Sequence, residues 1–587
     1  MRRFTCDFET NSTPDPDGKV RVWAYALFEI GSKDNFIYGN CIEDLIDWCQ
    51  AQKDNVALYF HNLKFDGAFI TYFLESNGFT WIEDVKEATD NSYTTLITNM
   101  GAWYNIEIFF KVAGKHRNKV SIYDSLKILN FSVEDIAKGF DLPIRKLELD
   151  YKAYREPGHK LTQHEIEYIR NDVEIVARAL DIMFKQGHTK MTIGSDALAH
   201  FKSMCPDFRG LFPVLDYDID RDVRQSYKGG FTYLNPLYKE KEGGSGWTLD
   251  VNSLYPSILA SAKLPVRVPL AFEGKYEYDP MYPLYVQTIS CRFELKPGKI
   301  PSIQIKSSFS FKPNEYLESS NGELVCLVLT NPDLELFFEQ YDIYDIQYQG
   351  GWKFEGVEGL FADFINYWTE QKIKAKKEGN RPQYLISKVI MNSTYGKFGT
   401  NPLGAKKRPY IGEDNALHEL YLDIEERKPI YVPVAAFTTA YARCKTIRTS
   451  QAIRDWSLKH KGYDAYIYSD TDSISMSRID LKDIKELQSI VDIDDYRLGA
   501  WKVETRFYKS KWVKSKCYCK LLNNGKMDVV VAGLPKKLGH LVNFDNFKIG
   551  FNTADFTDEE IGEKGRKLTY KHVPGGVVLV PTDFSIN

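Results

Sequence analysis

The sequence predicts an α/β protein made of several domains. Its 587 residues are more than one ordinary domain holds. Short apolar segments typical of strands alternate with longer segments of helical periodicity, and the 43% hydrophobic and 27% charged composition is that of a globular protein. Acidic residues also gather at predicted strand ends in two distant parts of the chain, which indicates two separate sites.

Composition excludes several classes of protein. No stretch is long and apolar enough to span a bilayer, and the N-terminus runs into a strand without a signal-peptide core, so we expect a cytoplasmic protein with no membrane partner. The nine cysteines lack paired spacing and predict neither a zinc site nor disulfides. The net charge of −4 disfavours a nucleic-acid protein, although local basic and aromatic patches still suit nucleic acid.

The first acidic group lies in the first third of the chain. Residues 3–8 are predicted to form a strand, on which Asp7 and Glu9 share one face because side chains alternate along a strand. A second apolar strand at 56–60 is followed by Asp66. These carboxylates at strand ends are candidate metal ligands.

A helix predicted at 161–183 adds to this group. Thr162 is its expected N-cap and Glu165 completes a capping box. Tyr168 and Asp172 are one turn apart on the same helical face. Four carboxylates plus a phenol predict a two-metal site for phosphodiester hydrolysis, in which the tyrosine orients the attacking water.

The second acidic group is divided between two distant segments. Asp470 and Asp472 lie in a tight turn between two short predicted strands, and their crowding favours a divalent cation. Asp250 ends a predicted strand at 247–250 that follows the glycine-rich segment 243–246, which we expect to be flexible. Asp250 could equally cap the helix that follows it.

A predicted helical hairpin lies between these segments. An apolar stripe at 361–368 starts the first helix, and residues 378–382 form the turn. On the second helix Lys388, Asn392 and Tyr395 share one face. Such a face is a poor core but suits a triphosphate and a nascent base pair.

These motifs resemble those of a known family. Asp7-x-Glu9, Asn62-x3-Asp66 and Tyr168-x3-Asp172 resemble the exonuclease motifs of proofreading DNA polymerases. The strings at 59–69 and 123–127 are similar to those of the protein-primed family B DNA polymerases of small tailed bacteriophages, the phi twenty-nine type. The resemblance implies an N-terminal RNase H-like 3′–5′ exonuclease domain, followed by a right-hand polymerase of palm, fingers and thumb with two family-specific insertions.

The resemblance also implies roles at the exonuclease site. It makes Asp7, Glu9, Asp66 and Asp172 metal ligands, with Tyr168 as a further catalytic residue. Lys146 matches another catalytic position, and Glu148 falls where the family has a metal-associated aspartate. The residues implied to hold the DNA strand are His61, Asn62, Phe65, Ser125, Leu126 and Tyr151.

Three further segments resemble polymerase motifs A, B and C. In motif A, Asp250 and the Val251 carbonyl would be metal ligands, and Tyr255 would exclude a 2′-hydroxyl from the incoming sugar. In motif C, Asp472 would be the ligand paired with Asp250, and Asp470 would support it.

The implied nucleotide-binding residues are Tyr255, Lys372, Lys388, Asn392 and Tyr395, while a further family lysine aligns with Tyr384. The implied DNA-binding residues are Tyr227, Gly229, Gly230, Ser253, Thr439, Arg443, Lys516 and Tyr518. If residues 516–519 form a strand, Lys516 and Tyr518 share one face.

The expected domains follow in chain order. They are the exonuclease domain 1–192, palm 193–261, a first insertion 262–360 that contacts the priming protein, fingers 361–399, a second insertion 400–432 for strand displacement and processivity, palm 433–528 and thumb 529–587.

The implied function is replication of a linear viral genome in the bacterial host cytoplasm. The resemblance implies a DNA-directed DNA polymerase that starts on a priming protein, displaces the opposite strand and proofreads with a 3′–5′ exonuclease. Two Mg²⁺ ions would act at each site, and Mn²⁺ could replace them. The implied partners are template and primer DNA, dNTPs and a terminal protein, and the enzyme is expected to be a monomer.

Two other classes are weighed against this hypothesis. A metal-dependent glycosyltransferase also carries an Asp-x-Asp turn, but it has no use for the first acidic group or for the Lys388–Tyr395 helix face. A non-catalytic DNA-binding or packaging protein would leave seven carboxylates, gathered in two groups, without a role.

Overall fold

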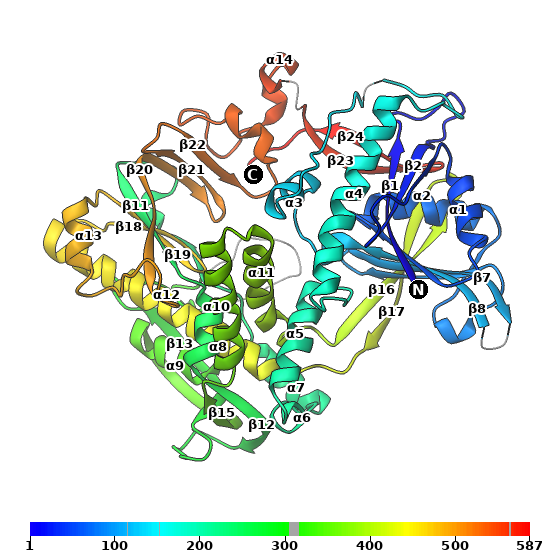
Figure 1. Ribbon diagram of the computed structural model, residues 1–587. Helices are drawn as coiled ribbons and strands as arrows, with labels where there is room; N and C mark the ends of the chain where they lie inside the picture. Colours follow the sequence, from blue (N-terminus) through cyan, green and yellow to red (C-terminus); the bar gives the residue numbers. More distant parts are fainter. Residues whose placement is uncertain (114–115, 152, 305–315, 563–564) are drawn as a thin grey trace.

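The computed structural model describes residues 1–113, 116–151, 153–304, 316–562 and 565–587. Residues 305–315, inside the predicted insertion at 262–360, lie outside the described residues. One large sheet comes from the N-terminal third and a second from the later parts of the chain, with long helices between them (Figure 1). Within the described ranges, no helix combines the length and the apolar character that crossing a membrane requires.

The N-terminal sheet has a parallel centre, β1–β4–β8, and antiparallel neighbours. Alternation along β1 decides what each face carries: Phe4, Cys6 and Phe8 pack in the core on the α2 side, whereas Thr5 donates a hydrogen bond to the Val173 carbonyl of α4. The predicted strands at 3–8 and 56–60 are confirmed. The elements are β1 (Arg2–Thr10), β2 (Val22–Glu29), β3 (Phe36–Gly39), α1 (Ile42–Gln50), β4 (Val56–Phe60), α2 (Leu63–Ser76), β5 (Thr80–Trp81), β6 (Ser92–Thr98), β7 (Trp103–Ala113), β8 (His116–Asp124), α3 (Val133–Gly139) and α4 (Gln163–Lys185).

Helix α4 starts as the sequence predicts. The Thr162 hydroxyl accepts the Glu165 backbone N–H, and the Glu165 carboxylate accepts the Thr162 N–H in return. Tyr168 and Asp172 are both buried on the side that packs against β1 and β2. The capping box therefore fixes where the helix begins, and packing against β1 and β2 buries Tyr168 and Asp172.

The second sheet has the order β22–β21–β20–β11–β19–β18–β9, and β10 pairs with β20. Its strands β18 and β19 form the predicted hairpin around the acidic turn, and β11 lies next to β19. The short helix α8 and the long helix α12 pack on this sheet and on each other. The elements are α5 (Ile193–Met204), α6 (Phe208–Leu211), α7 (Tyr217–Ser226), β9 (Thr232–Leu234), β10 (Glu242–Gly243), β11 (Gly246–Val251), α8 (Leu254–Ser261), α12 (Val432–Lys461), β18 (Tyr466–Asp470), β19 (Ser473–Ser477), α13 (Leu481–Leu487), β20 (Trp501–Lys514), β21 (Cys517–Leu522) and β22 (Met527–Val531).

The expectation of flexibility at 243–246 was wrong. Gly243 pairs with Ser510 in β10–β20, and Gly246 is the first residue of β11. A Cβ on Gly246 would lie 1.9 Å from the Met476 carbonyl oxygen, so glycine is required here by close backbone approach. The glycines serve strand packing.

The predicted helical hairpin is confirmed as α10 (Ala362–Glu378) and α11 (Arg381–Phe398), which pack against each other. Asn380 caps α11 through the Gln383 N–H. Helix α5 also packs on α11, which ties the hairpin to the chain that leaves the N-terminal unit.

The two predicted insertions form separate small structures. The described residues of 262–360 contain a sheet of order β12–β15–β13–β14 and the helix α9. Residues 400–432 form the hairpin β16–β17, whose first strand pairs with β6 and so extends the N-terminal sheet. The bounds are β12 (Lys263–Phe272), β13 (Leu284–Leu295), β14 (Val325–Thr330), α9 (Asn331–Gln340), β15 (Tyr341–Glu358), β16 (Leu403–Ile411) and β17 (Leu417–Glu426).

The C-terminal segment returns to the N-terminal unit, as Figure 1 shows for β23 and β24. The Val20 N–H donates to the Pro574 carbonyl at 2.9 Å, and Gly576 lies against the Phe69 ring. The boundary expected at 528/529 is corrected, because β22 runs through it and belongs to the second sheet. The remaining elements are α14 (Asp558–Ile561), β23 (Lys567–Val573) and β24 (Gly576–Thr582).

Candidate active sites

The first carboxylate group assembles between β1 and α4. One oxygen from each of Asp7, Glu9 and Asp172 lies within 4.8 Å of the others. Asp66, from the first turn of α2, is buried and electrostatically coupled to Asp7 and Glu9. The structure thus brings together the four carboxylates that the sequence predicts as one site. A cavity of about 170 Å³ opens beside Asp7 and Asp172.

These carboxylates are crowded and poorly neutralised. Burial and the neighbouring Asp172 raise the pKa of Asp7 to about 7, and burial with the Asp7 charge raises the pKa values of Glu9 and Asp66 well above their usual range. Lys146, which forms an ion pair with Asp172, lowers the pKa values of Asp7 and Glu9 in part, and Arg155 adds to this effect at Glu9.

The residues fit a pair of divalent cations. Within the described residues, one oxygen each of Asp66 and Asp172 is buried without a hydrogen-bond partner, which is costly unless a cation takes it. An all-oxygen carboxylate set is also what hard divalent cations prefer. Glu148 is exposed and lies outside the three-carboxylate group found among the described residues, so its metal role stays a prediction.

Two tyrosines lie at the edge of the group. The hydroxyls of Tyr151 and Tyr168 are 2.5 Å apart, and Tyr151 is exposed while Tyr168 is buried. Burial and the charge of Glu9 raise the pKa of Tyr168, so its hydroxyl stays protonated and can orient a water molecule.

Among the predicted strand-binding residues, two are structural supports. Ser125 is fully buried, and its hydroxyl lies 3.0 Å from His61 Nδ1. His61 donates from Nε2 to the Phe131 carbonyl. We therefore correct the prediction for Ser125. Its buried side chain positions His61 and does not contact DNA directly. Asn62, Phe65 and Leu126 remain accessible.

Sequence reasoning missed a contribution from the C-terminal hairpin. The Asn62 amide donates to the Tyr570 hydroxyl at 3.0 Å, and the Phe65 and Tyr570 rings are 6.2 Å apart. Lys64 lies 5.3 Å from the centre of the same Tyr570 ring. No local pattern links residues about 500 positions apart, so only the docked hairpin reveals this contact.

The second carboxylate group lies where β11 meets the β18–β19 turn. The Val251 N–H donates to the Asp472 carbonyl at 2.7 Å, and Asp250 is the register partner of Ser473. Burial raises the pKa of Asp472 to about 6, and the charge of Asp250 adds to this shift. Asp250 is not a helix cap, because α8 begins after Ser253.

The two aspartates of the turn have different surroundings. Asp470 accepts hydrogen bonds from Thr232 and Tyr468, and Lys516 lies 3.7 Å from it. No protein donor to the Asp472 carboxylate is found beyond its own backbone within the described chain. Asp472 is therefore the more open of the two carboxylates, and its role as the metal ligand stays a prediction.

The turn between these aspartates is strained. Thr471 has φ +61°, which a β-branched residue rarely adopts. Its N–H donates to the Phe231 carbonyl, and its own carbonyl accepts from Thr446, both at 2.7 Å. These bonds hold the turn in a conformation that aims Asp472 at β11.

Strand β20 contributes two charged residues that the sequence did not indicate. Lys502 lies opposite Asp250, with Nζ 3.1 Å from Oδ1. The register shifts between Thr248 and Leu249, which leaves Glu504 as an extra residue in a bulge. Glu504 is among the charges that raise the Asp472 pKa.

The predicted nucleotide-binding residues face this group from α8, α10 and α11. The Tyr255 and Tyr395 rings stack with centroids 4.1 Å apart. Lys388 and Asn392 are exposed on α11, one turn from each other. Burial lowers the pKa of Lys372, and the charges of Lys388 and Lys502 add to this. The site thus places cations and stacked rings beside the carboxylates.

Two predicted DNA-binding side chains prove to be buried. Arg443 donates to Asp333 and to the carbonyls of Lys228 and Gly229, and the Thr439 hydroxyl donates to helix carbonyls. The direct DNA contact predicted for Arg443 is corrected to support of the loop at 227–230, and that predicted for Thr439 to a hydrogen bond within its own helix. Gly230 lies against Thr471, because a Cβ there would be 2.4 Å from its hydroxyl.

Lys516 does not lie on the predicted strand. β21 starts at Cys517, and Lys516 is in the preceding turn with φ +56°. Its backbone N–H donates to the Tyr468 hydroxyl, and the Tyr468 and Tyr518 rings are 5.6 Å apart. Lys516 and Tyr518 therefore reach the acidic hairpin because of the turn before β21, and not because they share one face of a strand.

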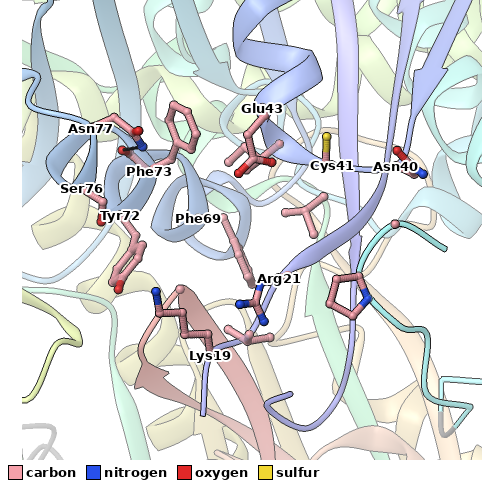
Figure 2. Close-up of a pocket in the computed structure, with 16 residues that line it drawn as sticks. Lys19, Arg21, Asn40, Cys41, Glu43, Phe69, Tyr72, Phe73, Ser76 and Asn77 are labelled. Atoms are coloured by element: carbon pink, nitrogen blue, oxygen red, sulfur yellow. Dashed lines mark hydrogen bonds between the residues drawn. The ribbon is translucent and has the colours of Figure 1, made fainter. Parts of the chain in front are cut away.

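Another cavity lies away from both carboxylate groups. Figure 2 shows this space of about 460 Å³, lined by side chains of α2, by Lys19 and Arg21, and by Gly575 of the C-terminal hairpin. Arg21 forms ion pairs with Asp15 and Asp17. The cavity marks the seam where the hairpin meets the N-terminal unit.

Comparisons with known proteins agree with this architecture. The model of the organellar and viral type B DNA polymerases matches residues 48–489, and the chain belongs to this family. More particularly, the chain is similar to the DNA polymerases of Bacillus phage Nf, at 44% identity over 605 residues, and of Bacillus phage phi29, at 43% over 606. Each alignment covers 100% of this chain and 99% of the relative.

Solved structures show the same likeness. The orthorhombic crystal form of phi29 DNA polymerase matches with a TM-score of 0.90 at 41% identity, over 100% of both chains. The phi29 enzyme in complex with primer-template DNA and incoming nucleotides matches at 0.89, again at 41% identity over 100% of both chains. The predicted multi-domain α/β fold is thereby confirmed, and the glycosyltransferase and non-catalytic hypotheses are set aside.

Proposed function

We propose that this DNA polymerase has two active sites, a nucleotidyl-transfer site at Asp250 and Asp472 and a 3′–5′ proofreading exonuclease at Asp7, Glu9, Asp66 and Asp172. The observation that carries the proposal is the presence of two carboxylate groups on two separate sheets, each with its own surrounding side chains. Both groups suit Mg²⁺, which Mn²⁺ can replace. When bound, the ions activate the attacking oxygen and stabilise the leaving oxygen.

At the polymerase site, the protein's own residues bind and orient the substrates. Lys388 and Lys372 are proposed to hold the triphosphate, and Asn392 and Tyr395 to contact the nascent base pair. Lys388 and Asn392 are exposed on α11, and the Tyr395 ring stacks on Tyr255, which supports these roles. The Tyr255 ring is fixed by its stack on Tyr395, so it can exclude a 2′-hydroxyl. The Lys516–Tyr518 turn and the loop at 227–230 are placed to hold the primer and template strands.

At the exonuclease site, the protein holds the strand end and orients water. Asn62, Phe65 and Leu126 offer an amide, a ring and an apolar surface to a single strand. The protonated Tyr168 hydroxyl orients the attacking water, and Lys146 neutralises part of the carboxylate charge. Tyr151, bonded to Tyr168, is the exposed end of this pair.

We further propose that the enzyme replicates a linear viral genome by protein-primed initiation and strand displacement in the cytoplasm of a bacterial host. The full-length similarity to phage enzymes supports this proposal. The small sheet at 262–360 is the proposed contact for a terminal protein, and the hairpin at 400–432 the proposed strand-displacement element. The enzyme is proposed to act as a monomer on template, primer and dNTPs.

Two substitutions test the division into two sites. Asp472→Asn should abolish extension of a primed template and leave degradation of single-stranded DNA intact, whereas Asp7→Ala should do the reverse. If either variant lost both activities while its melting temperature was unchanged, the two-site assignment would be wrong.

Protein priming has its own test. Labelled dATP, Mg²⁺ and a candidate priming protein should give label that migrates with that protein in a denaturing gel. Label found only in free DNA would contradict the proposal while leaving the polymerase assignment in place.

A further inference from the structure

Lys502 forms a cross-strand ion pair with the predicted metal ligand Asp250. The two residues are register partners in β20 and β11, and Nζ lies 3.1 Å from Oδ1. Both side chains reach solvent, with 35% of Lys502 and 20% of Asp250 exposed. Opposite charges facing each other across strands attract, but a partly exposed pair of this kind contributes little to stability. Structural support alone does not account for a lysine at this place.

Other cations crowd the same place without carboxylate partners. Lys372 and Lys376 come from α10 and Lys388 from α11, and in the described parts of the chain none of the three has an ion pair. Burial lowers the pKa of Lys372, and the charges of Lys388, Lys502 and Lys376 add to this. Mutually repelling cations that face an open site require an anion that the protein itself does not supply.

We propose that Lys502 is a further nucleotide-binding residue, held by Asp250 in the free enzyme and released to the triphosphate when Asp250 takes up a metal ion. The inference rests on the proposed role of Asp250 as a metal ligand. A carboxylate oxygen that neutralises Lys502 is a weaker ligand, so lysine and metal compete for it. Once the metal has bound, Lys502 joins Lys372 and Lys388 as a cation facing the phosphates. Metal and nucleotide binding are therefore coupled through this side chain.

The first measurement is metal binding without catalysis. Mn²⁺ is titrated by electron paramagnetic resonance into protein carrying Asp7→Ala and Asp66→Ala, so that the exonuclease site does not contribute. Lys502→Met should raise the Mn²⁺ affinity of the remaining site about three- to fivefold, because the competing ion pair is gone. Lys509→Met is the matched control, since Lys509 lies on the same strand and pairs with Glu242 instead.

The second measurement is nucleotide binding. A complex with a dideoxy-terminated primer and Mn²⁺ is titrated with the next dNTP, and its retention is followed by gel shift. Lys502→Met should weaken dNTP binding about tenfold, because one charged phosphate contact is lost. Lys502→Arg should keep most of the parent's dNTP affinity. Lys502→Gln, which keeps a polar side chain in the strand, should bind dNTP as weakly as Lys502→Met.

The outcomes separate the inference from the proposal on which it rests. A fall in Mn²⁺ affinity in Lys502→Met would show that the lysine merely holds Asp250 in place, and an unchanged affinity would show that it does not compete; either overturns the inference. Asp250→Asn tests the proposal on which the inference rests, namely that Asp250 is a metal ligand. If that variant bound Mn²⁺ as tightly as its parent, the metal assignment of Asp250 would itself be wrong.

Discussion

At the scale of single residues, surroundings decide what chemically similar side chains can do. Asp470 and Asp472 are two residues apart. Thr232 and Tyr468 donate hydrogen bonds to the Asp470 carboxylate and Lys516 lies close to it, whereas the Asp472 carboxylate is left open. The spacing of the two aspartates indicated a metal site, and the motif implied which one binds. Only the packed hairpin shows the physical reason for the difference.

The difference between the two aspartates can be measured. Asp472→Asn should lower nucleotide incorporation by at least about a hundred- to a thousandfold, because a proposed ligand of the catalytic metal ion loses its charge. Asp470→Asn should have a clearly smaller effect, since its neighbours still hold the turn. Single-turnover incorporation rates at saturating Mg²⁺ would show this, and equal losses would contradict the separate roles.

Tyr255 gives a second prediction at this scale. Its ring is fixed by the 4.1 Å stack on Tyr395, so replacing it opens space where the 2′ position of the sugar is expected. Tyr255→Val should raise the ribo/deoxy incorporation ratio about tenfold or more, since a steric barrier of a few kcal/mol is removed. Tyr255→Phe keeps the ring and is the control. An unchanged ratio in the valine variant would remove the sugar-gate role.

At the scale of elements, local signals located helices and strands well. The capping box at Thr162, the strand 56–60 and the helical hairpin around 378–382 all appear where the sequence predicts them. Caps, turns and periodicity act over a few residues, so they can be read without the fold. The glycines at 243–246 led to a wrong prediction of flexibility. They are required by the close approach of another strand, which is a non-local contact.

The α4 capping box makes a prediction about pH. Although burial opposes it, hydrogen bonds from Thr162, His159 and Arg155 lower the pKa of Glu165 to about 2. A carboxyl with a lower pKa in the folded state stabilises the protein fully above its unfolded pKa of about 4.3, and that stabilisation is lost as the pH falls toward 2. Glu165→Gln should therefore cost about 1–3 kcal/mol at pH 7.

Urea unfolding between pH 7 and pH 3 checks this. The difference between Glu165→Gln and the parent should be constant above about pH 5 and shrink below it. Glu167→Gln, two residues along the same helix and without an ion pair in the described structure, is the control. A difference that stayed constant down to pH 3 would show that the carboxylate charge does not stabilise the helix start.

At the scale of the whole molecule, distant segments complete the N-terminal unit. The hairpin β16–β17 extends its sheet through β6, and the C-terminal hairpin docks on α2 and Val20. The N-terminal unit is thus built from three parts of the sequence, which Figure 1 shows side by side. The docked hairpin thereby ties the N-terminal unit to the end of the chain, which comes after the second sheet.

Gly575 tests that docking. It has φ +93°, and a Cβ there would lie 2.1 Å from the Val20 carbonyl oxygen, so Gly575→Ala must push the hairpin away. Hydrogen–deuterium exchange at Val20 and along β23–β24 should become faster, and Tyr570 should lose its bond to Asn62. Gly404→Ala, where the added methyl meets open space, should change neither. Unchanged exchange in Gly575→Ala would show that the contact does not hold the hairpin.

The sequence by itself determined the strands and helices, the two acidic groups and the family, because periodicity, caps and motif spacing act within a few residues. It also placed each functional side chain on a face of its own element. The tertiary structure decided which of those side chains meet. Arg443 is buried on Asp333, Tyr570 reaches Asn62 and Lys502 faces Asp250 through sheet register and domain docking, which bring together residues 110, 508 and 252 positions apart. Such contacts depend on the packing of the whole chain, and no local pattern encodes them.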